Sequence, residues 1–236
     1  MTHRKSQRWD KFGFLIGTMK NTVNKSTGII LPIVFFFLFS YASAQQKQDE
    51  PKDAKFYIDR GIAFGEKGQY DQAIADFTKA LEIDSKSADA YLYRGRAYGY
   101  KSQHDQAISD YTKAIGINPK SADAYHFRGI AYGEKGQFDQ AVDDYTKALE
   151  IGPKSAGTYL SRGIAYVNKG HFNWAIDDFT KALEMNPRSA DVYYNRAVAY
   201  YFMKDYNNSW KDTQKAQDLG YKFPPNFLEN LRKALK

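Results

Sequence analysis

From residue 54 onward, small and aromatic residues return at a constant interval of 34 positions. The stretches 54–87, 88–121, 122–155, 156–189 and 190–223 align without a gap. Counted from the start of each stretch, places 4, 8 and 11 fall on one face of a helix, and places 20, 24 and 27 fall on one face of a second helix. The pattern predicts five helix-turn-helix units, which must stack because a single hairpin cannot bury its apolar faces.

The residues at the recurring places suit closely packed helices. Place 8 is Gly in four units and Ala in the fifth, place 20 is Ala in four, and place 24 is aromatic in four. We expect the small residues to let the two helices approach, while the aromatic residues at places 4, 11 and 24 fill the core. Gly136 suits a left-handed helix C-cap. Asp139 suits the N-cap of the second helix, and Ser155 suits the N-cap of the next unit. The places equivalent to Asp139 hold Asp71, Asp105, Asn173 and Asn207.

This pattern of length, small places and aromatic places resembles the tetratricopeptide repeat (TPR) family. Proline at place 32 of the middle units, Pro119, Pro153 and Pro187, belongs to the same resemblance. The resemblance spans residues 54–223 and implies an all-α fold, a right-handed superhelical solenoid of five 34-residue helix-turn-helix repeats. We number the stretches above as repeats 1 to 5.

Residues 224–236 carry Phe227, Leu228, Leu231 and Leu235 at helical spacing. We expect a capping helix that covers the apolar side of repeat 5, since repeat arrays need a solvated end. An amphipathic helix that binds a partner is the alternative.

The N-terminal part of the chain has the features of a secretory signal. An apolar run of about a dozen residues, 28–40, follows several basic residues and precedes Ala42-Ser43-Ala44. We interpret residues 1–44 as a signal peptide cleaved after Ala44, with the true start at either Met1 or Met19. An uncleaved N-terminal membrane anchor is the alternative. Residues 45–53 are polar and predict a flexible linker, and the mature chain is expected in the periplasm or outside the cell.

Charge and composition exclude several classes of function. The net charge is +7, but residues 1–44 contribute six basic residues against one acid, which leaves 28 basic and 26 acidic residues in the remainder. The repeats therefore have little excess charge with which to bind nucleic acid. There is no cysteine, so disulfides and thiolate metal sites are excluded. The four histidines show no ligand spacing and no phosphate-binding glycine motif occurs, so we expect no enzyme activity, no cofactor and no metal site.

One pair of charged places is unusual for the family. Place 7, which is usually apolar, is Arg in all five repeats, and place 23 is Asp in all five. Because the planar guanidinium matches a carboxylate in geometry, we expect structural ion pairs, within a repeat or between neighbours. Independent solvation of both groups is the alternative. These residues are Arg60, Asp76, Arg94, Asp110, Arg128, Asp144, Arg162, Asp178, Arg196 and Asp212.

The resemblance also implies a binding groove, because family members often hold an extended peptide or a partner's helix on the face made by the first helices. Places 5 and 9 line its middle: Ile58, Ile62, Leu92, Arg96, His126, Ile130, Leu160, Ile164, Tyr194 and Val198. Some family members clamp a terminal carboxylate with Lys and Asn at these places of the first repeat, where this chain has Ile58 and Ile62. The groove is thus expected to take an apolar or amphipathic segment. Packing of these residues against one another between repeats is the alternative.

Taken together, these features favour a non-catalytic scaffold that holds another protein in the cell envelope or outside the cell. A self-associating structural protein of the envelope is the alternative. The partner and the oligomeric state are not encoded in any motif of the sequence.

Overall fold

The computed structural model describes residues 53–152 and 155–236. The predicted signal peptide, its cleavage site and linker residues 45–52 lie outside the described residues. The described part contains eleven α-helices and no strand, which agrees with the all-α fold class. Asp53, at the end of the predicted linker, is the N-cap of the first described helix, where its carboxylate accepts a hydrogen bond from the Phe56 backbone N–H.

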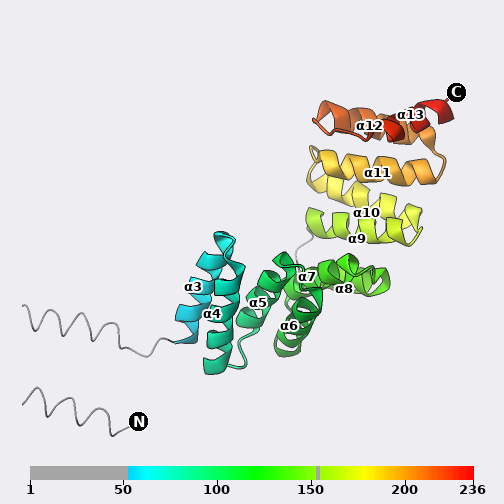
Figure 1. The fold of residues 1–236 in the computed structure, drawn as a ribbon. Helices are drawn as coiled ribbons and strands as arrows, with labels where there is room; N and C mark the ends of the chain where they lie inside the picture. The colour runs from blue at the N-terminus through cyan, green and yellow to red at the C-terminus, as the bar shows by residue number, and fades with distance from the viewer. Residues whose placement is uncertain (1–52, 153–154) are drawn as a thin grey trace, which may run out of the picture. The chain divides into compact units, whose positions relative to one another are not determined.

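Each repeat is a pair of antiparallel helices, 13 residues and then 14 residues long in repeats 1 to 4 and 13 and 13 in repeat 5 (Figure 1). The first helices are α3 (Ala54–Glu66), α5 (Ala88–Tyr100), α7 (Ala122–Glu134), α9 (Ala156–Asn168) and α11 (Ala190–Phe202). The second helices are α4 (Tyr70–Ile83), α6 (His104–Ile117), α8 (Phe138–Ile151), α10 (Phe172–Met185) and α12 (Tyr206–Asp218). The last helix is α13 (Pro225–Ala234).

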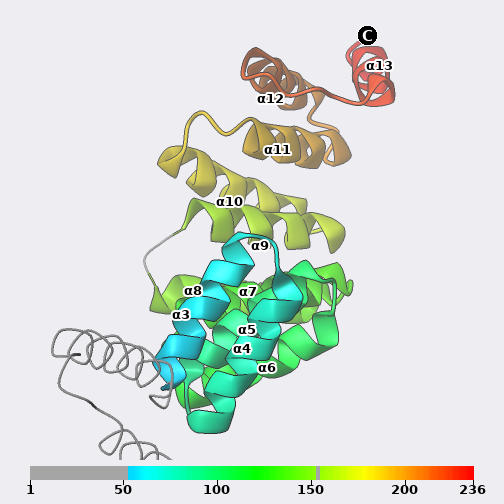
Figure 2. The ribbon, with the colours of Figure 1, turned by 60° about the vertical axis from the view of Figure 1, so that its left-hand side comes forward.

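The helices stack in sequence order. Each second helix packs on the first helix of the next repeat, as Figure 2 shows for α10 and α11. The first helices of neighbouring repeats also touch one another, from α3 and α5 through to α9 and α11. Neighbouring second helices make no comparable contact within the described residues. The first helices are thus the more crowded side of the stack, and on this side the sequence places the groove.

The core of each hairpin depends on a glycine that faces an aromatic ring. In repeat 3, a Cβ atom on Gly129 would lie only 2.8 Å from Cε1 of Tyr145. Repeats 1, 2 and 4 have the same arrangement, with distances of 2.5 to 2.7 Å. Repeat 5 reverses the sizes, because Ala197 replaces the glycine and Thr213 replaces the ring, and both are fully buried. The larger residue at place 8 of repeat 5 is therefore accompanied by a smaller residue at place 24, which removes the clash that a ring would make.

The helix ends follow the sequence in part. The Ser155 hydroxyl accepts a hydrogen bond from the Thr158 N–H and caps α9, as predicted. Gly136 has the left-handed backbone expected at the end of α7, with φ +71°. Ser102 and Lys204 hold the same place with φ of 58° and 63°, although neither is glycine.

The predicted N-caps of the second helices are wrong. Asp139 is the second residue of α8, whose N-cap is Gln137 and has no side-chain cap bond. The same holds for Asp71 and Asp105, which lie in the first turns of α4 and α6. In repeat 5 the cap is Asp205 rather than Asn207, and its carboxylate accepts a hydrogen bond from the Asn208 N–H at 3.2 Å.

The C-terminal helix α13 packs on α12 and buries Leu231 completely. The chain between α12 and α13 contributes Tyr221, which stacks on Tyr194 with ring centroids 4.5 Å apart, and Phe223, which stacks on Phe227 at 5.4 Å. These contacts cover the apolar side of repeat 5, as a capping helix requires. Of the helices described, none is both long enough and apolar enough to span a membrane.

Candidate functional site

The structure brings every Arg of place 7 together with the Asp of place 23 in the same repeat. In repeat 3, Arg128 donates from Nε to Oδ2 of Asp144 at 2.7 Å and from Nη2 to Oδ1 at 2.8 Å. The other four repeats have the same two-bond geometry between 2.5 and 2.9 Å. The five Asp residues are almost fully buried, so the pairs serve to satisfy a carboxylate inside the hairpin.

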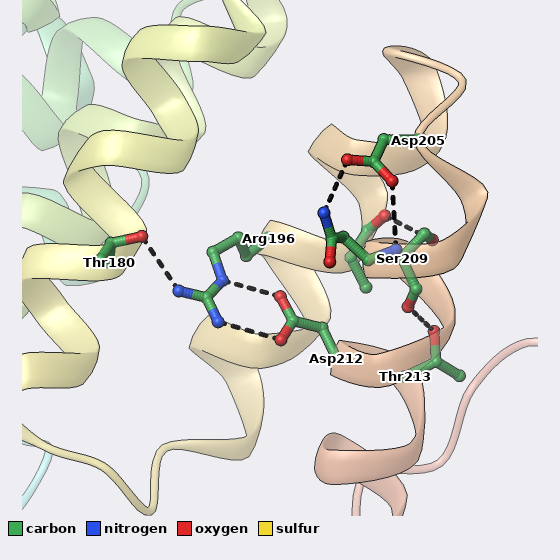
Figure 3. Close-up of polar contacts among 8 residues, drawn as sticks. Thr180, Arg196, Asp205, Ser209, Asp212 and Thr213 are labelled. Atoms are coloured by element: carbon green, nitrogen blue, oxygen red, sulfur yellow. Dashed lines mark hydrogen bonds and ion pairs between the residues drawn. The ribbon is translucent and has the colours of Figure 1, made fainter.

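In repeats 2 to 5, a threonine of the preceding repeat extends the pair across the junction. Figure 3 shows Arg196 between Asp212 and Thr180, whose hydroxyl accepts a hydrogen bond from Nη1 at 2.9 Å. The same bond joins Arg94 to Thr78, Arg128 to Thr112 and Arg162 to Thr146. We call this series the Arg–Asp–Thr ladder. The threonine recurs at place 25 of repeats 1 to 4, and this recurrence was the signal that could have revealed the ladder.

Electrostatics in the ladder favour the charged guanidinium. The hydrogen bond to the carboxylate raises the pKa of Arg94 and Arg128 above the usual value, against the opposing effect of burial. Burial is the largest influence on Arg162 and Arg196 and lowers the pKa, but the hydrogen bond and charge of the paired Asp together outweigh it. The guanidinium groups of the ladder are therefore permanently charged.

The predicted groove residues lie on the first helices, where nine are half-buried and Ile164 is exposed. Several also contribute to packing between repeats. Ile58 and Ile62 pack against the cluster around Phe77, Leu92 against that around Tyr111, and Ile130 against that around Tyr145. Leu160 packs in the repeat 4 core, Tyr194 stacks on Tyr221, and Val198 is half-buried on α11. We call these ten residues the first-helix face.

Arg96 is the one residue of the first-helix face whose side chain carries a permanent charge. Its guanidinium carbon lies 4.8 Å from the ring centroid of Phe127 and 5.8 Å from that of Tyr93, so two aromatic rings hold it. Its Nε is buried and has no hydrogen-bond partner. Each of the other repeat arginines discussed above is paired with an aspartate, and no ion pair of Arg96 occurs in the described structure.

His126 links repeats 3 and 4 on the same face. Its Nδ1 lies 3.1 Å from the Thr158 hydroxyl, within hydrogen-bond distance, and Thr158 is 5% exposed. Burial lowers the pKa of His126 below its ordinary value, although the charge of Asp123 acts in the opposite direction. His126 is thus kept neutral near pH 7, and the first-helix face gains no second cation from it.

Comparison with known proteins decides the family. The pattern described as "TPR repeat" matches residues 61–101 and 95–136. Two patterns described as "Tetratricopeptide repeat" match residues 122–155 and 156–189, and residues 179–217. This chain belongs to the tetratricopeptide repeat family. A search of curated protein sequences found no match.

Solved structures of similar fold include MamA, with 24% identity and a TM-score of 0.64 over 67% of this chain and 93% of that chain. YrrB has 25% identity and a TM-score of 0.63 over 77% and 92% of the two chains. The pilF protein of Pseudomonas aeruginosa has 22% identity and a TM-score of 0.65 over 72% and 78%. These similarities support an all-α solenoid of TPR repeats, and the family supports a protein–protein interaction scaffold.

The described residues contain no group of His, Cys, Asp or Glu that could hold a metal ion. The polar side chains that recur in the repeats instead join helices to one another. The first-helix face remains the surface with residues of mixed chemistry, where apolar side chains surround the isolated Arg96.

Proposed function

We propose that this protein is an exported, non-catalytic adaptor that holds a segment of another protein against its first-helix face. The observation that carries the proposal is Arg96, a charged side chain that packs against Tyr93 and Phe127 and has no carboxylate partner among the residues that the structure describes. The arginines of the ladder, by contrast, are each paired with a buried aspartate. The solved structure of YrrB is titled "a TPR protein with an unusual peptide-binding site", which supports a peptide-binding role for a similar chain.

The chemistry of the face supports a particular kind of partner segment. Half-buried aliphatic residues at places 5 and 9 favour an apolar or amphipathic partner, and Arg96 favours an acidic group beside it. The partly buried guanidinium forms a stronger charge-assisted hydrogen bond than a fully solvated cation, because less water competes for it.

The proposal is tested by crosslinking from two sides of the array. A photoreactive amino acid is placed in the full chain at Ile164, on the first-helix face, and at Lys113, on the exposed side of α6. One envelope protein captured from Ile164 but not from Lys113 is then purified and its binding measured by calorimetry. Arg96→Met is expected to weaken binding by about tenfold, the effect of losing one charge-assisted hydrogen bond.

Equal capture from both positions, or unchanged affinity of Arg96→Met, contradicts the assignment of this face. Capture of a second copy of the chain supports the structural, self-associating alternative instead. Export is tested separately by fractionating cells and sequencing the mature N-terminus, which we expect to be Gln45.

A further inference from the structure

The turns between paired helices carry the same polar residues at three of the four repeat junctions. The Lys at place 14 of one repeat pairs with the Asp at place 18 of the repeat before it: Lys101 with Asp71, Lys135 with Asp105, and Lys169 with Asp139. At the junction of repeats 4 and 5 these places hold Met203 and Asn173. Both charges of the ion pair are therefore replaced together.

A third replacement at this junction adds apolar surface. Place 19 is Gln in repeats 1 to 3 and Trp174 in repeat 4. Trp174, Phe202 and Met203 are 54%, 56% and 42% exposed, whereas the other exposed large apolar residues described are spread singly along the array. We define the turn-edge patch as His171, Phe172, Asn173, Trp174, Phe202 and Met203.

The turn-edge patch is shaped by contacts among its own rings. The His171 and Trp174 centroids are 4.9 Å apart, and Phe172 stacks on Phe202 at 5.4 Å with an interplanar angle of 10°. Gly170 and the patch residues other than Phe202 line an open surface hollow of about 450 Å³. The hollow has room for an aromatic or long aliphatic side chain, and its walls are aromatic, thioether and amide groups.

A lysine follows the patch directly. Lys204 is exposed and has φ +63° at a place filled by Gly68, Gly136 and Gly170 in repeats 1, 3 and 4. A left-handed backbone is unfavourable for a side chain such as lysine. The chain therefore carries a cation next to an uncharged hollow at a position where glycine serves folding better.

We propose that the turn-edge patch is a second protein-docking site, which takes an aromatic or long aliphatic side chain of a partner protein with an acidic residue next to it. The centres of protein interfaces are enriched in Trp, Phe and Met and depleted of Lys and Asp, which is the exchange seen at this junction. Charge complementarity to Lys204 specifies the acidic neighbour. The hollow favours an inserted side chain over a flat lipid surface.

The test uses the full chain and three dye-labelled nonapeptides of Gly and Ser with a central Asp-Phe-Asp, Lys-Phe-Lys or Asp-Ala-Asp. Binding is measured by fluorescence anisotropy. We expect the Asp-Phe-Asp peptide to bind at least fivefold more tightly than either of the others at low salt. Equal binding of all three peptides, or no binding at millimolar protein, overturns the proposal.

The matched variant restores the residues of the other repeats: Met203→Lys, Asn173→Asp and Trp174→Gln together. Because repeats 1 to 3 fold with these residues, the thermal midpoint is expected to stay the same or rise, while affinity for the Asp-Phe-Asp peptide falls at least tenfold. Unchanged affinity contradicts the site. Lys147→Met, which removes an exposed cation on α8 outside both proposed sites, is the control and should leave peptide affinity unchanged.

Two further measurements distinguish other occupants. Sedimentation equilibrium that shows a dimer broken by the triple variant assigns the patch to a second copy of this chain. Binding to vesicles of zwitterionic and anionic lipid that the triple variant abolishes assigns it to a membrane surface. Either result overturns the assignment to a partner protein.

Discussion

Arg128 and Asp144 are joined by two parallel hydrogen bonds of 2.7 and 2.8 Å, and neither side chain is more than 17% exposed. The pair lies inside one hairpin, between α7 and α8. Because the third donor of Arg128 reaches Thr112 of repeat 2 at 3.0 Å, the same guanidinium holds both a hairpin and a repeat junction.

Replacing one member of this pair should destabilise the protein more than replacing both. Arg128→Met is expected to lower the free energy of unfolding by roughly 3 kcal/mol, because the Asp144 carboxylate is left buried without a partner. Arg128→Met with Asp144→Leu should recover at least about 1 kcal/mol, since no charge remains buried. Urea unfolding followed by circular dichroism measures both. A double variant no more stable than Arg128→Met contradicts the coupling. Asp59→Asn, which breaks an exposed pair with Lys55, is the control and should have no measurable effect.

The threonines of the ladder should set the cooperativity of the array. Replacing Thr78, Thr112, Thr146 and Thr180 by Val removes one inter-repeat hydrogen bond at each junction and should cost about 0.5–1 kcal/mol for each. Since repeat arrays unfold according to their nearest-neighbour coupling, the urea transition should broaden as well as shift. The matched Thr→Ser variant keeps the hydroxyl and should retain a sharp transition. If the Thr→Val and Thr→Ser variants have equally broad urea transitions, these hydrogen bonds do not couple neighbouring repeats.

The glycine at each helix crossing should be coupled to the ring that faces it. Gly129→Ala is expected to destabilise the protein by about 2 kcal/mol through overpacking against Tyr145. The double variant Gly129→Ala with Tyr145→Thr has the residue types that repeat 5 holds at this crossing, Ala197 and Thr213. Its loss in free energy of unfolding should be smaller than the sum of the two single losses by about 1 kcal/mol. The control is Gly133→Ala, whose Cβ would lie 3.8 Å from the Tyr145 hydroxyl. That change should be neutral or stabilise the helix by up to about 1 kcal/mol.

Stability should fall on mild acidification because of His126. Burial holds the folded-state pKa of this imidazole below its unfolded value, so the unfolded chain binds the proton more readily. The contribution is fully present above about pH 6.5, the unfolded pKa, and is lost as the pH falls toward the folded pKa. The test compares thermal midpoints at pH 7.5 and pH 5 for the wild type and for the double variant His126→Leu with Thr158→Ala. The double variant has the residue types that repeat 2 holds at these places, Leu92 and Ala90. The variant should lose less stability on acidification than the wild type. An equal loss would assign the pH dependence to other groups.

Periodicity alone was sufficient for the helices and their contacts within a hairpin. The meeting of Gly129 with Tyr145 follows from helical spacing, because places 8 and 24 must share the crossing of two antiparallel helices. The pairing of Arg128 with Asp144 follows from residue chemistry added to that crossing. Both relationships lie inside one repeat, where the geometry is fixed by the hairpin.

Contacts between repeats were harder to predict. Asp139 looked like an N-cap, but it is the second residue of α8. Its carboxylate reaches Lys169 of the next repeat at 2.5 Å. An Asp near a helix N-terminus is favourable either as a cap or in the first turn, so composition cannot separate the two. The contact of Arg128 with Thr112 could not be predicted, because the distance across a junction depends on how two hairpins stack. The significance of Trp174 becomes clear only from the structure, because the other junctions have a Lys–Asp pair that the junction of repeats 4 and 5 lacks.

The ladder also gives the array a polarity. Arg94, Arg128, Arg162 and Arg196 each reach toward the repeat before them. Within the described residues, Arg60 of repeat 1 has two ladder bonds rather than three. Its side chain is 39% exposed, against 14% to 17% for the others. A more hydrated ion pair is weakened more strongly by dissolved ions. Rising ionic strength should therefore fray the scaffold from repeat 1, while the opposite end stays closed beneath α13.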